Sequence, residues 1–194
     1  MGYKGDIYYI KQIMEGNTIA FTNLIDRHKD KAFNLAFRIC GSREEAEEVT
    51  QDAFLKAYKA LNSFKMKSSF ATWLYRIVYN TAISLVRIKK KGVLSIEDFP
   101  ADATDFIGNN TSEEEAEAEY RNSLVNFALQ KLTEDERGLI SFYYYEEMTT
   151  DEIADITGIS KSNIKVKLFR ARQKMIEIVE KVEKKKLIYH GEAR

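Results

Sequence analysis

The stretch "TTDEIADITGISKSNIKVKLFRARQKM", residues 149–175, reverses its charge across a glycine. Its first nine residues contain three acidic side chains and no basic one, whereas residues 161–175 contain six basic side chains and no acidic one. A Gly-Ile-Ser turn at residues 158–160 separates the two parts. Two helices joined by a short turn that contains glycine are typical of a helix-turn-helix.

Apolar residues in this stretch are spaced so that the two predicted helices bury one side against each other. In a helix-turn-helix the second helix enters the major groove of DNA, where the phosphates attract basic side chains and repel carboxylates. A basic amphipathic helix on a solvated surface is the alternative, but the helix start at Thr149, the turn, the apolar seam and the charge reversal agree on the motif. The predicted seam consists of Ile153, Ala154, Ile156, Ile159, Ile164 and Leu168.

The composition of the whole chain favours helices. Of its 194 residues, 44% are hydrophobic and 31% charged, with nine glycines and a single proline. So few turn-forming residues argue against sandwiches, barrels and collagen-like arrays. The sequence therefore predicts an all-α fold of two small helical domains, residues 1–91 and 121–194, of which the second contains the helix-turn-helix.

An acidic segment separates the two predicted domains. Residues 92–120 contain nine acidic side chains, no basic one and the only proline, Pro100. A segment with high net charge and few apolar residues cannot bury enough surface to fold alone. We therefore expect residues 92–120 to form a flexible linker that is disordered or loosely held.

Two long helices dominate the predicted first domain. Ser42 and Glu45 match a capping box, which satisfies free amides at the start of a helix over residues 43–64. The apolar stripe predicted for this helix consists of Ala46, Val49, Ala53, residues 55–57 and residues 60–61.

In the second long helix, predicted over residues 70–91, aromatic residues alternate with basic residues. Trp73, Tyr75 and Tyr79 alternate with polar and basic residues, and four basic residues lie at the end of the helix. Aromatic side chains next to cationic ones can bind unstacked nucleobases and single-stranded nucleic acid. Packing of the same aromatics in a core is the alternative, and the spacing alone leaves both open.

The residues that carry enzyme chemistry are scarce. The two histidines, His28 and His190, stand far apart in the chain, and no glycine-rich phosphate loop or nucleophile elbow occurs. Cys40 is the single cysteine, which excludes an intramolecular disulfide and makes a reducing cytoplasm the simplest compartment. No apolar run approaches the about 18 residues of a membrane span. We expect a protein that is not an enzyme and has no metal, cofactor, signal peptide or membrane insertion.

Three segments, in this order, resemble bacterial RNA polymerase sigma factors of the extracytoplasmic-function (group 4) type. The resemblance implies a transcription initiation factor that binds core RNA polymerase, reads the minus-thirty-five promoter element and melts the minus-ten element. Core polymerase and promoter DNA are the implied partners, an anti-sigma factor is a further one, and the free protein is expected to be a monomer. The segments are "AEEVTQDAFLKAYKALNSF" (46–64), "SSFATWLYRIVYNTA" (68–82) and "LTEDERGLISFYYYEEMTTDEIADITGISKSNIKVKLFRARQKM" (132–175).

The same resemblance implies roles for individual residues. Docking on core polymerase is implied for Glu48, Gln51, Asp52 and Lys56. Contact with the minus-ten element is implied for Lys65, Lys67, Trp73, Tyr75, Arg76, Asn80 and Arg87. Contact with the minus-thirty-five element is implied for Lys161, Asn163, Lys165, Val166, Lys167, Phe169 and Arg170.

Two alternative functions explain less of the sequence. A free-standing helix-turn-helix repressor leaves the pattern of residues 46–82 unexplained, and a helical adaptor that binds only proteins leaves the acid-free run of six bases unexplained. The hinge Lys65-Met66-Lys67 departs from the family pattern, so the base preferred at the minus-ten element stays open. Val166 cannot donate to a base edge but can touch a thymine methyl group.

Overall fold

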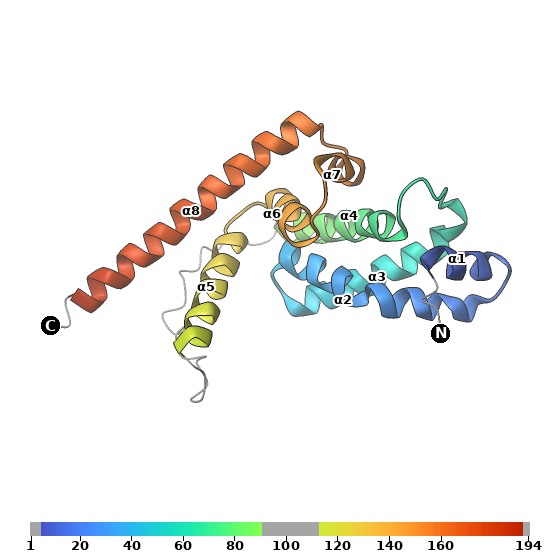
Figure 1. Cartoon of the computed structure of the whole chain (residues 1–194), viewed down its shortest axis with the longest axis horizontal. Helices are drawn as coiled ribbons and strands as arrows, with labels where there is room; N and C mark the ends of the chain where they lie inside the picture. Colours follow the sequence, from blue (N-terminus) through green and yellow to red (C-terminus); the bar gives the residue numbers. More distant parts are fainter. Residues whose placement is uncertain (1–4, 91–112, 192–194) are drawn as a thin grey trace.

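The structure, a computed structural model, describes residues 5–90 and 113–191, and every regular element within these residues is helical, which confirms the predicted all-α class (Figure 1). The elements are α1 (Asp6–Met14), η1 (Thr18–Ala20), α2 (Phe21–Cys40), α3 (Arg43–Ala60), η2 (Leu61–Ser63), α4 (Phe70–Lys90), α5 (Glu113–Gln130), α6 (Glu134–Ile140), η4 (Ser141–Tyr145), α7 (Thr150–Thr157) and α8 (Lys161–Gly191).

The first domain is built on α2, α3 and α4, which pack against one another along their lengths. Leu24, Leu35 and Leu74 are fully buried between them. Gly41 ends α2 in the left-handed conformation, with φ of 84°, which a residue with a side chain rarely adopts. Ser42 then accepts a hydrogen bond from the amide of Glu45 and starts α3, which is one half of the predicted capping box, while the Glu45 carboxylate pairs with Lys89.

The second domain contains two short capped helices, α6 and α7, between the longer α5 and α8. Thr133 with Glu136 and Thr149 with Glu152 form complete capping boxes at the starts of α6 and α7. Gly158 ends α7 with φ of 72°, so the chain turns sharply into α8. The predicted helix-turn-helix is therefore formed by α7 and α8.

The predicted linker is wrong at its C-terminal end, because α5 begins at Glu113 rather than near residue 121. Residues 113–119 are glutamate and alanine only, which are strong helix formers, and acidic residues in a first turn complement the helix dipole. Glu117 and Arg121 add an ion pair of 3.1 Å one turn apart. The remainder of the predicted linker, residues 92–112, lies outside the described residues.

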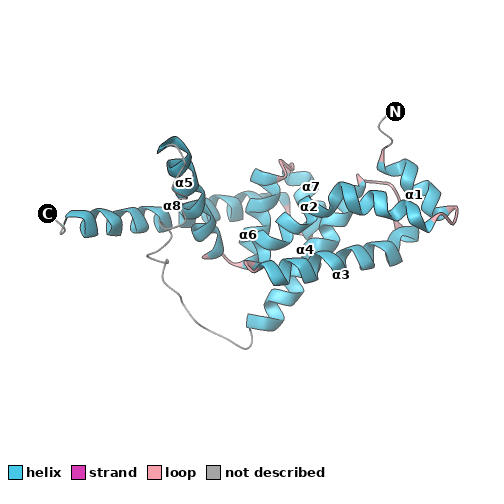
Figure 2. Cartoon of the chain, turned by 90° about the horizontal axis from the view of Figure 1, so that it is seen from below, coloured by secondary structure: helices cyan, strands magenta, loops and turns pink. Residues whose placement is uncertain are grey.

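The second domain lies directly on the first. Figures 1 and 2 show α6 beside α4 and α2, while α8 runs away from the first domain with α5 against it. A Cβ atom on Gly138 of α6 would lie 2.6 Å from the ring of Tyr79 of α4. Phe142 is fully buried, and its ring centre lies 5.6 Å from that of Tyr79 and 6.5 Å from that of Tyr75.

Glu136 joins α6 to α8. Its carboxylate accepts hydrogen bonds from the amide and the hydroxyl of Thr133, both at 3.0 Å, and from Lys174 at 2.5 Å. Burial alone would raise the pKa of Glu136, but the hydrogen bonds from Lys174 and Thr133 outweigh burial and lower this pKa. The ionised form of Glu136 therefore stabilises the fold.

Glu136→Gln should lower the free energy of unfolding at neutral pH by about 0.5–1 kcal/mol, because the charged hydrogen bond to Lys174 is lost. A carboxylate whose folded pKa is depressed contributes stability above its unfolded pKa of about 4.3, and this contribution is lost as pH falls through the folded value. The difference from wild type should thus shrink when the pH is lowered from neutral to below this unfolded value. Urea unfolding at both pH values measures it, with the exposed Glu177→Gln as control; a difference that is unchanged at low pH would contradict the assignment.

Candidate nucleic-acid interface

The predicted seam between α7 and α8 is formed as expected. Ile153 and Ile164 are fully buried, and Leu168 is 5% exposed. Ala171, one turn beyond Leu168, is also fully buried. With this side of α8 held against the protein, Lys165, Arg170 and Arg172 are exposed, whereas Lys161 and Lys174 pair with acidic residues of α7 and α6.

The seven residues expected to touch the minus-thirty-five element lie in the first three turns of α8. Lys167 is half-buried and the other six are exposed. Phe169 and Val166 are 56% and 45% exposed, so neither contributes to a core. Apolar groups beside cations suit a DNA major groove, where a thymine methyl group can be touched. Lys161 forms an ion pair with Asp151 of α7, which holds the start of α8 near α7.

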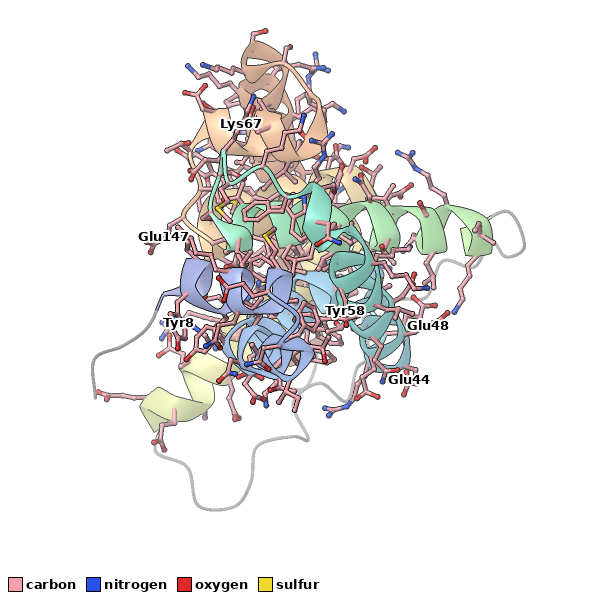
Figure 3. The ribbon with its side chains drawn as sticks, turned by 90° about the vertical axis from the view of Figure 1, so that its right-hand side faces the viewer. Tyr8, Glu44, Glu48, Tyr58, Lys67 and Glu147 are labelled. Atoms are coloured by element: carbon pink, nitrogen blue, oxygen red, sulfur yellow. The ribbon has the colours of Figure 1, made fainter. Side chains whose placement is uncertain are left out.

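The residues expected at the minus-ten element gather on α4 and the loop before it. Lys65, Lys67, Arg76, Asn80 and Arg87 are exposed. Figure 3 shows Lys67 in the loop between α3 and α4, away from the body of these helices.

The hinge before α4 is shaped by aromatic packing. Trp73 is half-buried, with its ring centre 5.0 Å from that of Phe64 and 5.7 Å from that of Phe70. Met66 in the hinge has φ of 53°, a left-handed conformation that is uncommon outside glycine. The aromatic packing anchors the hinge while its two lysines stay in solvent.

Tyr75, which the resemblance also assigns to the minus-ten element, is buried. It is 3% exposed, and its hydroxyl donates a 2.9 Å hydrogen bond to Glu146 of the second domain. Tyr79, one turn along α4, is 5% exposed and donates to Asp135 at 2.9 Å. Burial, with the adjacent carboxylates, raises the pKa of both phenols far above the ordinary value, so both remain donors. Of the three interleaved aromatics, Tyr75 and Tyr79 are covered by the second domain.

The residues expected to dock on polymerase share one face of α3. Glu48, Gln51 and Lys56 are exposed and Asp52 is half-buried. Asp52 pairs with Lys56 at 2.8 Å, and Lys56 also donates to Thr81 of α4 at 3.2 Å. Figure 3 shows Glu44 and Glu48 on the outer side of α3, whereas Tyr58 lies toward α2, with its ring centre 5.0 Å from that of Phe21.

An apolar groove beside this face was missed by the sequence analysis. It has a volume of about 590 Å³ and lies between α2 and α3, lined by Phe21, Ile25, Phe54, Leu55 and Tyr58 among others. Leu55 is 52% exposed, so its assignment to the buried stripe of α3 is wrong. The signal was present in the spacing, because Ala46, Val49, Ala53 and Ala57 follow the helical period and Leu55 does not.

Reactive and metal-binding groups are sparse in the part of the chain that the structure describes. No three histidine, cysteine or acidic side chains there are arranged to hold a metal ion. Burial raises the pKa of the Cys40 thiol to about 11, which keeps it protonated and unreactive. None of the helices within residues 5–90 and 113–191 combines the length and the apolar character that a membrane span requires.

Comparison with known families gives two matches, one on each domain. The family "Sigma-70 region 2" matches residues 24–92, and the family "Sigma-70, region 4" matches residues 124–175. The ECF RNA polymerase sigma factor SigW of Bacillus subtilis (strain 168) is 30% identical over 176 residues, which cover 84% of this chain and 91% of SigW. The RNA polymerase sigma-H factor of Pseudomonas aeruginosa is 29% identical over 174 residues, covering 87% and 90% of the two chains.

Two solved structures share the fold. CnrH, in complex with the cytosolic domain of CnrY, superposes with a TM-score of 0.65 at 24% identity, covering 91% of this chain and 98% of CnrH. The sigma factor RpoE of Bartonella quintana, in complex with the anti-sigma factor NepR, gives a TM-score of 0.63 at 23% identity, covering 82% and 96%.

Replacement of Ile164 by alanine should destabilise the fold strongly, whereas replacement of Phe169 by alanine should leave its stability almost unchanged. Ile164→Ala should cost about 2–5 kcal/mol, because it opens a cavity in the seam. Phe169→Ala should change the free energy of unfolding by no more than about 0.5 kcal/mol, because its ring already lies in solvent. Urea denaturation monitored by circular dichroism compares the two; equal losses would show that Phe169 is a core residue rather than part of a reading surface.

Proposed function

The chain belongs to the ECF RNA polymerase sigma factors, and we propose that α3 docks it on core polymerase, α4 with its preceding hinge opens the minus-ten element, and α8 reads the minus-thirty-five element. A sigma factor directs core polymerase to specific promoters, so both halves of the chain are needed for one task. The observation that carries the proposal is the match of both sigma-70 regions, in order, to the two helical domains.

Exposure and charge support the role of each surface. The exposed side of α8 combines basic side chains, which neutralise phosphates, with Phe169 and Val166, which can contact thymine methyl groups in the major groove. Arg76 and Asn80 are exposed on α4, and an amide offers both a donor and an acceptor to the edge of an extruded base. The acidic and polar face of α3 adjoins an apolar groove, a combination that suits a protein partner.

The proposed partners follow from the same family. We propose that the protein acts without catalysis or a cofactor, as a monomer when free, in the bacterial cytoplasm where core polymerase works. CnrH and RpoE, which share its fold, are in complexes with CnrY and the anti-sigma factor NepR, so an anti-sigma factor is a further proposed partner. A repressor or a protein-only adaptor would leave the sigma-70 region 2 match of residues 24–92 unused.

Docking is tested by Gln51→Ala combined with Asp52→Arg. Both side chains lie at the surface, so the variant should keep its fold while its affinity for core RNA polymerase of the same organism falls at least tenfold, equivalent to about 1.4 kcal/mol. Pull-down of core enzyme over a range of protein concentrations measures the change. Asp30→Arg, an equal charge reversal at an exposed site on α2, is the control; unchanged recovery of core by the α3 variant would refute docking through this face.

Promoter opening is tested by Asn80→Ala in the holoenzyme. The variant should form closed complexes at wild-type levels and open the minus-ten region less, because the extruded base loses a hydrogen-bonding partner. Permanganate reactivity of promoter thymines measures opening. Ser84→Ala, one turn along α4, removes only a local hydrogen bond to the backbone of Asn80 and serves as control. Wild-type opening by Asn80→Ala at limiting polymerase would remove Asn80 from this role.

A further inference from the structure

We propose that the N-terminal helix α1 sets the position of the hinge before α4, through a tie that runs from Asp6 to His28 and from His28 to Phe70. Asp6 and His28 are then positioning residues for opening of the minus-ten element, and they act without touching DNA. The inference rests on the proposed function in one respect, since it takes the hinge to be part of the surface that opens the promoter.

Helix α1 lies at the same end of the first domain as the hinge. Figure 1 shows α1 and the loop between α3 and α4 together at this end. The match to Sigma-70 region 2 begins at residue 24, whereas α1 ends at Met14. Ile10 in α1 is fully buried, so the helix is packed on the domain. The fold therefore holds, near the hinge, a helix to which the matched family region gives no role.

Asp6, in the first turn of α1, binds two successive residues of α2. Its carboxylate contacts Nε2 of His28 at 3.0 Å and Nε of Arg27 at 3.3 Å. An ionised carboxylate can only accept a hydrogen bond, so Nε2 of His28 donates the proton. The side chains of Asp6 and His28 are only 21% and 11% exposed, and salt screens such a partly buried contact less than an exposed one. The start of α1 is thus fixed to one point on α2.

His28 connects this point to the first residue of α4. Its ring centre lies 5.3 Å from that of Phe70, and both residues are buried. A side chain that is held by a hydrogen bond as well as by ring packing keeps one orientation. A displacement of Asp6 is therefore transmitted through the imidazole ring to Phe70.

Phe64 and Phe70 close the base of the hinge loop, residues 65–69. Their rings meet edge to face with centres 6.1 Å apart, and both pack on Trp73. Within the loop, the left-handed backbone of Met66 is a strained conformation that persists only when its surroundings hold it. The aromatic cluster at the base of the loop therefore determines where the loop lies, and this cluster includes the ring at the end of the tie.

A fixed hinge loop should favour opening of the promoter. Lys65 and Lys67 are exposed in the loop, and Figure 3 shows Lys67 away from the body of the helices. A loop that is ordered before it meets its ligand loses less conformational freedom on binding. Loss of the tie should therefore weaken strand opening and leave docking through α3 unchanged. A side chain that served stability alone would instead reduce both activities by the same factor.

Asp6→Asn tests the tie in the full chain, because it removes the charge and keeps the size of the side chain. Trp73 is the only tryptophan, so its fluorescence reports on the aromatic cluster. In the free variant the Trp73 emission should move to longer wavelength, and acrylamide should quench it more strongly, while far-UV circular dichroism stays unchanged. In the holoenzyme the equilibrium constant for opening, measured by permanganate reactivity of promoter thymines, should fall about fivefold, the scale of one lost hydrogen bond. Core binding and closed complexes should stay at wild-type levels.

Asp26→Asn is the matched control, because Asp26 is exposed on α2 and the change in net charge is the same. It should alter neither the emission nor the opening. Asp6→Glu keeps the carboxylate and should restore both measurements toward wild type. His28→Phe is a second variant in case Asp6→Asn fails to fold. It keeps a ring against Phe70 and loses the hydrogen bond to Asp6, so it should behave as Asp6→Asn does.

Folded variants with wild-type Trp73 emission would overturn the tie. This result would hold whether or not the proposed function is correct, because the measurement needs neither polymerase nor DNA. A shifted emission with normal opening would overturn the positioning role, as would an equal fall in core binding and opening. The proposed function fails separately, if the wild-type protein directs no promoter-specific transcript.

Discussion

The contact between the Tyr79 ring and the backbone of Gly138 determines where α6 lies, and much of the second domain depends on α6. On one side α6 meets α4 and α2 of the first domain. On the other, Glu136 holds Lys174 of α8, so that this helix of seven residues, together with α7, joins the first domain to α8. A side chain at position 138 would break this arrangement at its narrowest point.

Local features of the fold were predictable from the sequence because their causes are local. Thr133 and Thr149 start helices through residues three positions away, and Gly158 ends one through its own backbone conformation. The seam of the helix-turn-helix follows from the helical period alone. The start of α5 at Glu113 was missed because net charge was given more weight than the helix propensity of glutamate and alanine.

The burial of Tyr75 and Tyr79 could not be predicted in the same way. Their partners, Glu146 and Asp135, lie 71 and 56 residues further along the chain, and periodicity within α4 carries no information about them. The spacing left a core and a reading surface both open. Trp73 packs on Phe64 and Phe70 within the first domain, whereas Tyr75 and Tyr79 belong to the buried core at the interface between the two domains. The only sequence signal for it is Gly138, whose place inside a helix has no local explanation.

The length of α8 gives the molecule a mechanical property. Its 31 residues form a rod about 46 Å long, at a rise of about 1.5 Å per residue. The rod joins the body through its first turns and extends past it, with α5 alongside (Figure 2). Because α6 meets α8 at Lys174, about 26 Å of the rod lies beyond this contact, and a rotation of about 10° about α6 would sweep the far end of α8 through about 4 Å. A small tilt of α6 is therefore converted into a movement of several ångströms at the C-terminal end of α8.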